Sequence, residues 1–293
     1  MSMKLGAIEA GGTKMVCAVG NDRGEIFEQI SIPTETPEIT IPKMIAFFEG
    51  KGIEALGIGC FGPIDLNKES DTYGYITTTP KLAWQNFDMV GTFKRALNVP
   101  VGFDTDVNGS ALGEYTWGIG KGLNSCIYIT IGTGIGVGVI ADGHLLHGML
   151  HPEAGHILLS RKAEDEMESF CPFHDNCFEG LAAGPAIEKR WGKKAIELAD
   201  RDEVWELEAE YIAQALVNYT LTLSPERIIL GGGVMHQKQL LPLIRQQFKT
   251  LLNDYVVTEQ LNDLDSYIVV QSLDDKQGIM GALRLGELAL TEE

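Results

Sequence analysis

The chain has 293 residues, 44% of them hydrophobic, and its 23 basic against 41 acidic residues give a formal net charge of −18. This length and composition suffice for one large or two medium hydrophobic cores. So negative a surface repels phosphate backbones and anionic lipids, which argues against a nucleic-acid-binding or membrane-surface protein. The start of the chain lacks the pattern of a signal peptide, and no run of about 18 apolar residues suits a membrane span. We therefore expect a cytosolic protein.

Strands and helices alternate along the first half. Three consecutive strands are predicted, over residues 4–10, 15–21 and 25–33. The elements that follow are a helix over 41–50, a buried strand over 54–60, a helix over 88–97, a strand over 100–103 and a helix over 107–117. Residues 66–87 are polar and irregular, with TTTPKLAW at 77–84 as the expected lid or wall of a pocket.

The second half repeats this order. It opens with strands over 127–131 and 137–140, and residues 161–176 form a charged, irregular insertion. Helices are predicted over 184–191, 193–199, 203–223, from 237 onward and over 278–290, with a strand over 227–230. A repeated βββαβαβ order predicts two similar lobes with a cleft between them.

A glycine-rich turn occurs twice, 120 positions apart. The first is Gly11-Gly12-Thr13-Lys14 and the second is Gly132-Thr133-Gly134. Glycines beside a hydroxyl let backbone N–H groups approach an anion closely, although such turns also serve only to close hairpins. The repetition favours the anion, so we expect two hairpins that hold one polyphosphate from opposite sides.

Asp106 stands where a predicted strand gives way to a helix. A carboxylate in this position often caps the helix. If both hairpins hold phosphate, it is also placed to accept a hydroxyl proton while a phosphoryl group leaves ATP, and we favour this role of general base. The loop over 61–65 likewise follows the carboxyl end of a strand, where open α/β sheets bind ligands.

The five cysteines divide into two groups. Three lie in apolar, strand-like runs and are expected in the core: Cys17, Cys60 and Cys126. The sequence CPFHDNC at 171–177 instead offers Cys171, His174 and Cys177, and His156 precedes it. This set predicts a closed Cys2His2 zinc site that is structural, because four protein ligands leave no open position. The alternative, reduced surface cysteines beside ordinary histidines, would leave reactive thiols exposed.

Two glutamates flank the expected zinc ligands. Glu153 precedes His156 by three residues, and Glu179 follows Cys177 by two. A lone glutamate is usually solvated, but a rigidly held carboxylate is a good acceptor for polyol hydroxyls, so we expect both beside a sugar. Gly231-Gly232-Gly233 either passes close to the adenosine part of a nucleotide or makes a tight turn before a helix.

Together these motifs resemble the ROK family of sugar kinases. The matching segments fall in the family's order across nearly the whole chain: EAGGTK at 9–14, FGPID at 61–65, Asp106, GTGIGVG at 132–138, EAGH at 153–156, CPFHDNCFEGLAAGPAI at 171–187 and GGG at 231–233. The forms EAGGTK, CFGPID and CPFHDNC are most similar to the bacterial fructokinase branch.

The resemblance implies an α/β protein with the two-lobed, actin-like (ribonuclease H-like) ATPase fold, built from duplicated βββαβαβα units around a central cleft. The small lobe would comprise residues 1–116 joined by the C-terminal helix 278–293, and the large lobe 117–277 with the zinc-binding loop. Mg2+ would accompany ATP, Zn2+ would be structural, and the protein would usually be a homodimer.

The resemblance also assigns residues to roles. Asp106 would be the catalytic base. The sugar would lie near Gly62, Pro63, Thr105, Glu153, His156 and Glu179. The nucleotide would lie near Gly11, Gly12, Thr13, Lys14, Gly132, Thr133, Gly134, Pro185, Gly232 and Gly233. Zinc would bind His156, Cys171, His174 and Cys177.

Three residues depart from the family's usual pattern. Glu9 stands where many members have aspartate, Thr105 where asparagine often precedes the base, and Ala183 where serine often follows the zinc loop. None of these changes removes the base, the hairpins or the zinc ligands, so activity is expected, but they leave the sugar preference open.

We therefore expect ATP-dependent phosphorylation of D-fructose at the C6 hydroxyl, with mannose and glucose as alternatives because they share the reacting CH2OH. A catalytically silent sugar sensor is a different class and would be expected to lack the base or a hairpin. A sugar-responsive repressor would need a DNA-binding domain ahead of the first hairpin, whose glycine-rich turn is preceded by only ten residues in this sequence.

Overall fold

The computed structural model describes residues 2–291, and the chain divides into two compact units. The first unit comprises the chain up to Gly122, the short segment Leu145–His151 and the chain from Ser272 onward. The second unit comprises Leu123–His144 and Pro152–Gln271. The chain thus begins in the first unit and returns to it twice.

The first unit is built on a five-stranded sheet of order β3-β2-β1-β4-β7. Its strands are β1 (Lys4–Ala10), β2 (Lys14–Asn21), β3 (Ile26–Pro33), β4 (Ala55–Cys60) and β7 (Val101–Thr105). The first three form an antiparallel meander, and β4 and β7 run parallel to β1. Every residue of β4 is buried, as expected for a central strand with helices on both faces.

Helices cover both faces of this sheet. They are α1 (Pro37–Phe48), α2 (Met89–Leu97), α3 (Asp106–Thr116) and α10 (Gln277–Ala289), with a 3₁₀ turn η1 (Leu82–Trp84) and a two-stranded ribbon of β5 (Tyr75–Ile76) and β6 (Phe87–Asp88). Alternate residues of β1 point to opposite faces. Ile8 and Ala10 join the core that contains α1 and α2, and Leu5 and Ala7 join the core that contains α10.

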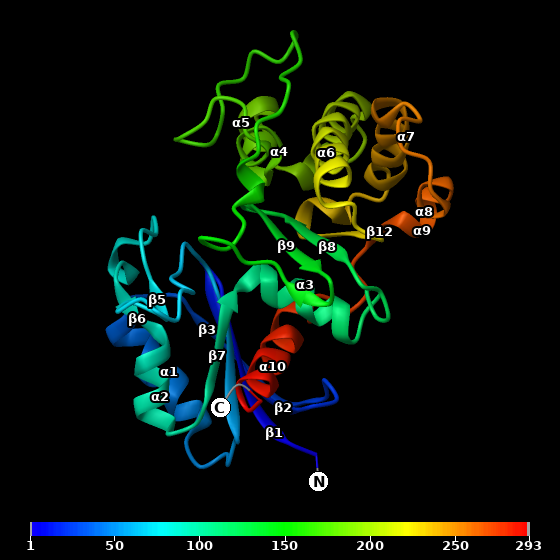
Figure 1. Cartoon of the computed structure of the whole chain (residues 1–293). Coiled ribbons are helices and arrows are strands. Elements are labelled where there is room, and N and C mark those ends of the chain that lie inside the picture. Colours follow the sequence, from blue (N-terminus) through cyan, green and yellow to red (C-terminus); the bar gives the residue numbers. More distant parts are fainter. Residues whose placement is uncertain (1, 292–293) are drawn as a thin grey trace. The chain divides into compact units, whose positions relative to one another are not determined.

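Helix α10 approaches its neighbours closely, and Figure 1 shows it beside β1, β2 and α3 although it is the last element of the chain. A Cβ atom at Gly57 of β4 would lie 1.7 Å from the backbone oxygen of Ala282. A Cβ at Gly281 would lie 1.7 Å from the oxygen of Gly109 in α3. Glycine is therefore required where α10 crosses β4 and α3, because any side chain would occupy the place of backbone.

The second unit repeats the strand order of the first, as β10-β9-β8-β11-β12. Its strands are β8 (Cys126–Ile131), β9 (Ile135–Ala141), β10 (His144–Leu145), β11 (Ile228–Gly231) and β12 (Ile268–Val270). Here too the second strand is antiparallel to the first, and the later strands are parallel to it. The predicted duplication of an α/β unit is confirmed.

The helices of the second unit are α4 (Phe178–Ala182), α5 (Gly184–Trp191), α6 (Asp202–Leu223), α7 (Leu240–Leu252), α8 (Glu259–Asn262) and α9 (Leu264–Tyr267). Three 3₁₀ turns accompany them: η2 (Ala154–His156), η3 (Ala195–Leu198) and η4 (Gly233–His236). Large side chains fill this interior, since Trp205 and Tyr211 of α6 and Phe248 of α7 are all fully buried.

Some predicted elements differ from the structure. The helix expected over 193–199 is only the 3₁₀ turn η3, because Gly192 ends α5 in a left-handed conformation with φ +70° and little chain remains before α6. The helix expected from 237 begins at Leu240, after η4. The stretch 66–87, expected to be irregular, contains β5 and the first residue of β6, with which β5 pairs.

The first unit extends beyond residue 116, where the predicted small lobe ended. Its chain continues to Gly122 and resumes at Ser272. The fully buried carboxylate of Glu114 in α3 holds both segments, accepting hydrogen bonds from Ile119 N at 3.1 Å and from Ser272 N and Oγ at 2.7 Å each. Two charge-assisted contacts to Ser272 bind the start of the returning chain firmly to α3.

Within residues 2–291, no helix combines the length and apolar character that crossing a membrane requires.

Candidate functional site

The first glycine-rich turn joins β1 to β2 in the first unit. It is closed by Gly11 N donating to Lys14 O at 3.0 Å, and Thr34 ties it to the end of β3 by donating Oγ1 to Gly11 O and N to Thr13 O. Thr13 and Lys14 are exposed. Among the residues that the structure describes, none accepts a hydrogen bond from the backbone N–H of Gly12 or Thr13. These donors are therefore available to an anion.

Helix α3 begins at Asp106, one residue earlier than the predicted start of the helix. The residue that caps this helix is Thr105, whose Oγ1 accepts from Asn108 N at 3.1 Å, so the alternative of Asp106 as the cap is wrong. One carboxylate oxygen of Asp106 accepts from Val107 N at 2.8 Å. Burial raises the pKa of this carboxyl and its backbone hydrogen bonds oppose the rise, so Asp106 is a stronger base than an ordinary aspartate.

Glu9 lies on β1 and interacts electrostatically with Asp106. Burial is the main cause that raises its pKa to about 7, Asp106 adds to the rise, and Lys14 opposes it. A buried carboxyl whose ionisation is disfavoured by a neighbouring carboxylate marks a position where a cation would be favourable. Carboxylate oxygens are also the donors that Mg2+ prefers.

The loop 61–65 lies at the same sheet edge as Asp106, because Cys60 at the end of β4 pairs with Thr105 at the end of β7. The bond between Gly62 and Pro63 is cis, and Thr77 donates to Pro63 O through its N at 2.8 Å and its Oγ1 at 3.0 Å. The first unit therefore brings Gly62, Pro63 and Thr105 to one edge, together with the first hairpin.

The second glycine-rich turn joins β8 to β9 in the second unit. Gly132 N donates to Gly134 O at 2.9 Å, and Gly184 N at the start of α5 donates to Gly132 O at 2.8 Å. Pro185 lies in the first turn of α5, and Thr133 at the tip of the hairpin is exposed. The helix start is thus fixed against the hairpin, an arrangement that directs helix N–H groups toward an anion.

Glu179 of α4 is hydrogen-bonded to this hairpin rather than free. Its Oε2 accepts from Ile135 N at 2.9 Å, and a Cβ at Gly134 would lie 2.7 Å from the same oxygen. Its Oε1 lies 3.9 Å from Nε2 of His156. Glu153, the other predicted sugar ligand, is exposed at the start of η2. Glu179 therefore connects the second hairpin to the candidate metal ligands.

The three glycines at 231–233 are not equivalent. A Cβ at Gly231 would lie 2.4 Å from the Tyr128 hydroxyl, and Gly232 has φ +86° with a Cβ position 2.4 Å from Ile131 O. Both are glycine for reasons of local packing and conformation. A Cβ at Gly233 would meet nothing within 4 Å, so only this third glycine leaves open space that a nucleotide could use.

Four side chains converge in the insertion as the sequence predicts: His156, Cys171, His174 and Cys177 offer ligand atoms that all lie within 4.8 Å of one another. Nδ1 of His156 is 3.9 Å from Sγ of Cys171 and 3.6 Å from Sγ of Cys177. Nδ1 of His174 is 3.6 Å from Sγ of Cys171. These separations fit the corners of a tetrahedron around Zn2+, whose bonds to sulfur and nitrogen are about 2.0–2.3 Å.

The surrounding chain holds this donor set in place. Cys177 caps α4, since its Sγ accepts from Gly180 N at 3.3 Å, and Phe178 N donates to Ile157 O beside His156. Asp165 pins the rest of the insertion through Arg190, with two contacts of 3.0 Å, and through the hydroxyl of Tyr211 at 2.7 Å. The donors are therefore preorganised.

The whole chain matches known proteins. The sequence pattern of the ROK family matches residues 5–288. A Bacillus subtilis (strain 168) protein named "Putative fructokinase" is 53% identical over 290 residues, which are 99% of this chain and 97% of the relative. A fructokinase of Pediococcus pentosaceus is 49% identical over 288 residues, which are 98% and 99% of the two chains.

This chain belongs to the ROK family. A solved ROK family glucokinase from Streptomyces griseus, in complex with glucose and AMPPNP, is similar in structure with a TM-score of 0.76 at 25% identity, over 97% of this chain and 99% of that one. The fold is accordingly the two-unit, actin-like ATPase fold of ROK sugar kinases.

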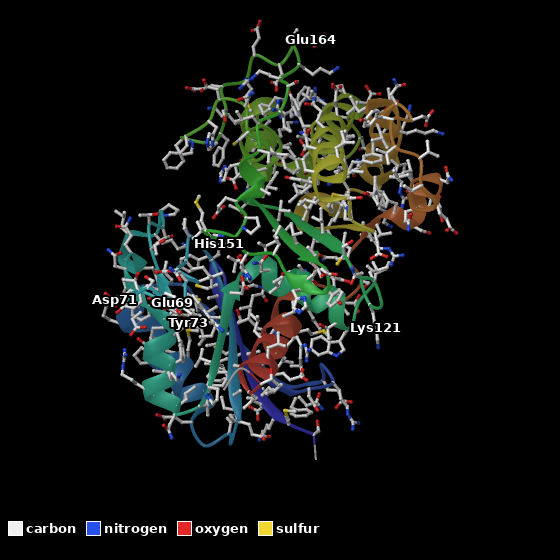
Figure 2. The ribbon with its side chains drawn as sticks, in the orientation of Figure 1. Glu69, Asp71, Tyr73, Lys121, His151 and Glu164 are labelled. Atoms are coloured by element: carbon white, nitrogen blue, oxygen red, sulfur yellow. The ribbon has the colours of Figure 1, made fainter. Side chains whose placement is uncertain are left out.

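Two histidines of this ROK chain were not singled out from the sequence. Nε2 of His147 lies 2.8 Å from Oδ2 of the buried Asp104, whose Oδ1 accepts from Asn108 Nδ2 at the start of α3. Nε2 of His151, labelled in Figure 2, accepts from Ile64 N at 3.3 Å. The available signal was HGMLH at 147–151, which places two histidines four residues apart in an irregular segment.

Proposed function

We propose that this ROK protein transfers the γ-phosphoryl group of ATP to the C6 hydroxyl of D-fructose, giving fructose 6-phosphate and ADP. The observation that carries the proposal is near-full-length identity of 53% and 49% to two relatives named as fructokinases. The site supports it, since a desolvated carboxyl and a hairpin with free N–H donors lie in one unit.

In this proposal Asp106 accepts the proton of the C6 hydroxyl as the oxygen attacks the γ-phosphorus, and the bond to the β-phosphate oxygen breaks. A base with a raised pKa holds that proton better, which favours transfer. The N–H groups of Gly12 and Thr13 stabilise charge on the phosphates. Mg2+ bound with ATP would supply further charge neutralisation, and the oxygens of Glu9 are suitable hard donors for it.

We assign the remaining residues as follows. Nucleotide binding is proposed for Gly11, Gly12, Thr13 and Lys14 of the first unit and for Gly132, Thr133, Gly134, Pro185, Gly232 and Gly233 of the second. Sugar binding is proposed for Gly62, Pro63, Thr105, Glu153, His156 and Glu179. Packing of Gly232 against Ile131 supports a role for its backbone only.

The test of the function is ADP release with Mg-ATP and fructose, mannose, glucose or N-acetylglucosamine in turn. We expect fastest turnover with fructose and a loss of about a thousandfold or more in Asp106→Asn, the size expected for a required base. Asp202→Asn is the matched control, because Asp202 is also the first residue of a helix. No turnover with any sugar, while nucleotide and sugar still bind, would contradict the kinase and favour a silent sensor.

We also propose that His156, Cys171, His174 and Cys177 hold one structural Zn2+. The support is the soft donor set and its separations. Bound through Nδ1, His156 keeps Nε2–H directed toward Glu179 and available to a sugar oxygen. Metal analysis of the purified protein is expected to find about one zinc per chain, and less than about half an equivalent would contradict the site.

Two further proposals concern the cellular location of the protein and its oligomeric state. All five cysteines are free, which suits the reducing cytoplasm. A homodimer is proposed from the family resemblance, and light scattering is expected to give twice the chain mass of 32.0 kDa.

A further inference from the structure

One lysine outside the family motifs lies over the first hairpin. Lys81 belongs to the segment Thr77–Trp84, which runs between β5 and β6 of the first unit. If Gly12 carried a Cβ, that atom would lie 3.1 Å from Cε and 3.8 Å from Nζ of Lys81, with nothing else within 4 Å. The missing side chain at Gly12 therefore leaves the space into which the lysine extends.

The segment that carries Lys81 is held firmly. Lys81 N donates to Thr79 Oγ1 at 3.3 Å, and Trp84 N donates to Lys81 O at 2.8 Å. The Trp84 ring is 1% exposed and packs edge-on against Phe61 and Phe87, at centroid distances of 6.0 and 5.4 Å. A lysine stem that starts from so fixed a backbone loses less freedom when its ammonium binds a ligand.

The lysine segment and the hairpin share one anchor. Trp84 Nε1 donates to Glu35 O at 2.8 Å, and the neighbouring Thr34 Oγ1 donates to Gly11 O at the same distance. Both sides of the space above Gly12 are thus fixed to two adjacent residues at the end of β3. The position of the ammonium relative to the free N–H groups of the hairpin is therefore defined by the backbone.

The ammonium of Lys81 lacks a carboxylate partner. Among residues 2–291, no acidic group lies within 4.0 Å of its Nζ, although the chain has 41 acidic residues and a net charge of −18. A half-buried lysine buries its stem and keeps its ammonium at the surface, where it can meet a ligand. Its three N–H donors instead remain available beside the backbone donors of Gly12 and Thr13.

We propose that the Lys81 ammonium binds the γ-phosphoryl group of ATP and stabilises the charge that develops on it during transfer. The γ position follows from the location of the base, because Glu9, three residues before Gly12, pairs with Gly59 of β4, and a Cβ at Gly59 would lie 3.4 Å from Cα of Asp106. The cation and the base thus belong to the same end of the first hairpin, where the reacting phosphorus has to lie. This inference rests on the proposed kinase function, and it makes Lys81 a catalytic residue of that reaction.

The test compares Lys81→Met with Lys81→Arg and with Lys94→Met. Methionine keeps the length and removes the charge, arginine restores a cation, and Lys94 is an exposed lysine on α2 of the same unit. We expect kcat to fall about a hundredfold in Lys81→Met, as for loss of one donor to a developing oxyanion. The KM for fructose should change less than about threefold, Lys81→Arg should recover part of kcat, and Lys94→Met should match the parent protein.

A calorimetric titration separates this role from the function itself. In the presence of Mg2+, Lys81→Met should bind AMPPNP about tenfold more weakly than the parent, which corresponds to a loss of about 1.4 kcal/mol in binding free energy. The same variant should bind ADP with unchanged affinity. If the affinities for AMPPNP and ADP fall equally, or if neither affinity falls, the assignment is overturned. If the parent phosphorylates no sugar, the proposed function fails, but the contrast between AMPPNP and ADP still decides the role of Lys81.

Discussion

The two units share a strand order, but the interior of each unit is packed in a different way. In the first, glycines let α10 pack backbone against backbone on β4 and α3. In the second, large buried side chains such as Trp205 and Tyr211 fill the interior, and four candidate metal ligands gather in the insertion. A duplicated topology therefore does not imply duplicated packing or chemistry, because helices of different residue composition can cover the same sheet.

The largest effect is expected from a substitution that breaks the glycine packing of the first unit. In Gly57→Ala the new methyl group would overlap Ala282 O, and neither backbone can move without displacing β4 or α10. We expect the free energy of unfolding to fall by about 3 kcal/mol or more, at the upper end for overpacked sites. Urea denaturation measures it. Gly233→Ala is the control, because the space there is open, and equal stability of the two variants would contradict the packing argument.

Removing the proposed metal should affect only the second unit. Cys177 is fully buried, so Cys177→Ser is expected to lose the zinc and about 2–3 kcal/mol of stability. Hydrogen exchange should quicken around residues 156–178 and stay unchanged in β1. A zinc chelator should lower the melting temperature of the parent but not of Cys177→Ser, and Cys17→Ser should keep its zinc. Equal sensitivity of all three proteins to the chelator would count against the site.

A smaller effect is expected at the second hairpin, where the carboxylate of Glu179 lies against the backbone, in contrast to the lysine that lies over the first hairpin. Glu179→Ala leaves the N–H of Ile135 without its acceptor and should cost about 1–2 kcal/mol of stability. Glu179→Gln keeps an oxygen in place and should recover most of that loss. Thermal unfolding of the two variants distinguishes the hydrogen bond from the charge, and a glutamine variant as unstable as the alanine variant would show that the charge matters more.

The smallest effect concerns His147. The hydrogen bond to Asp104 raises the pKa of this imidazole above its usual value, although burial opposes the rise. Protonated His147 therefore stabilises the folded state below about pH 6.5, the unfolded value, and this contribution is lost as the pH rises through the folded value. Relative to His147→Gln, the parent should gain less than about 1 kcal/mol at pH 5.5 and nothing at pH 8.5. A difference independent of pH would exclude this linkage.

Local patterns predicted the sheets well. The strand pair on either side of Gly132–Gly134 and the long helix α6 follow from hydrophobic period, and the duplication follows from the shift of 120 positions. The convergence of the candidate metal ligands was also predictable, because Cys171, His174 and Cys177 lie within seven residues. In each of these cases the residues that interact are close in sequence or lie in a regular element.

Contacts between distant residues were not predictable. Nothing near Lys81 in the sequence indicates Gly12, because the two meet only through the shared anchor at Thr34 and Glu35. The segment Leu145–His151 reads as an ordinary loop, yet it belongs to the first unit. The start of this helix was misplaced by one residue for a different reason, since Asp106 and Thr105 are both good caps and backbone geometry chooses between them.

The order of the elements along the chain bears on how the protein folds during synthesis. The strands β1, β2 and β3 are made first, but the helix that covers one face of their sheet is α10, residues Gln277–Ala289. The second unit needs no residue beyond Gln271. On the ribosome the second unit can thus complete before the first, whose sheet keeps an uncovered apolar face until α10 is added.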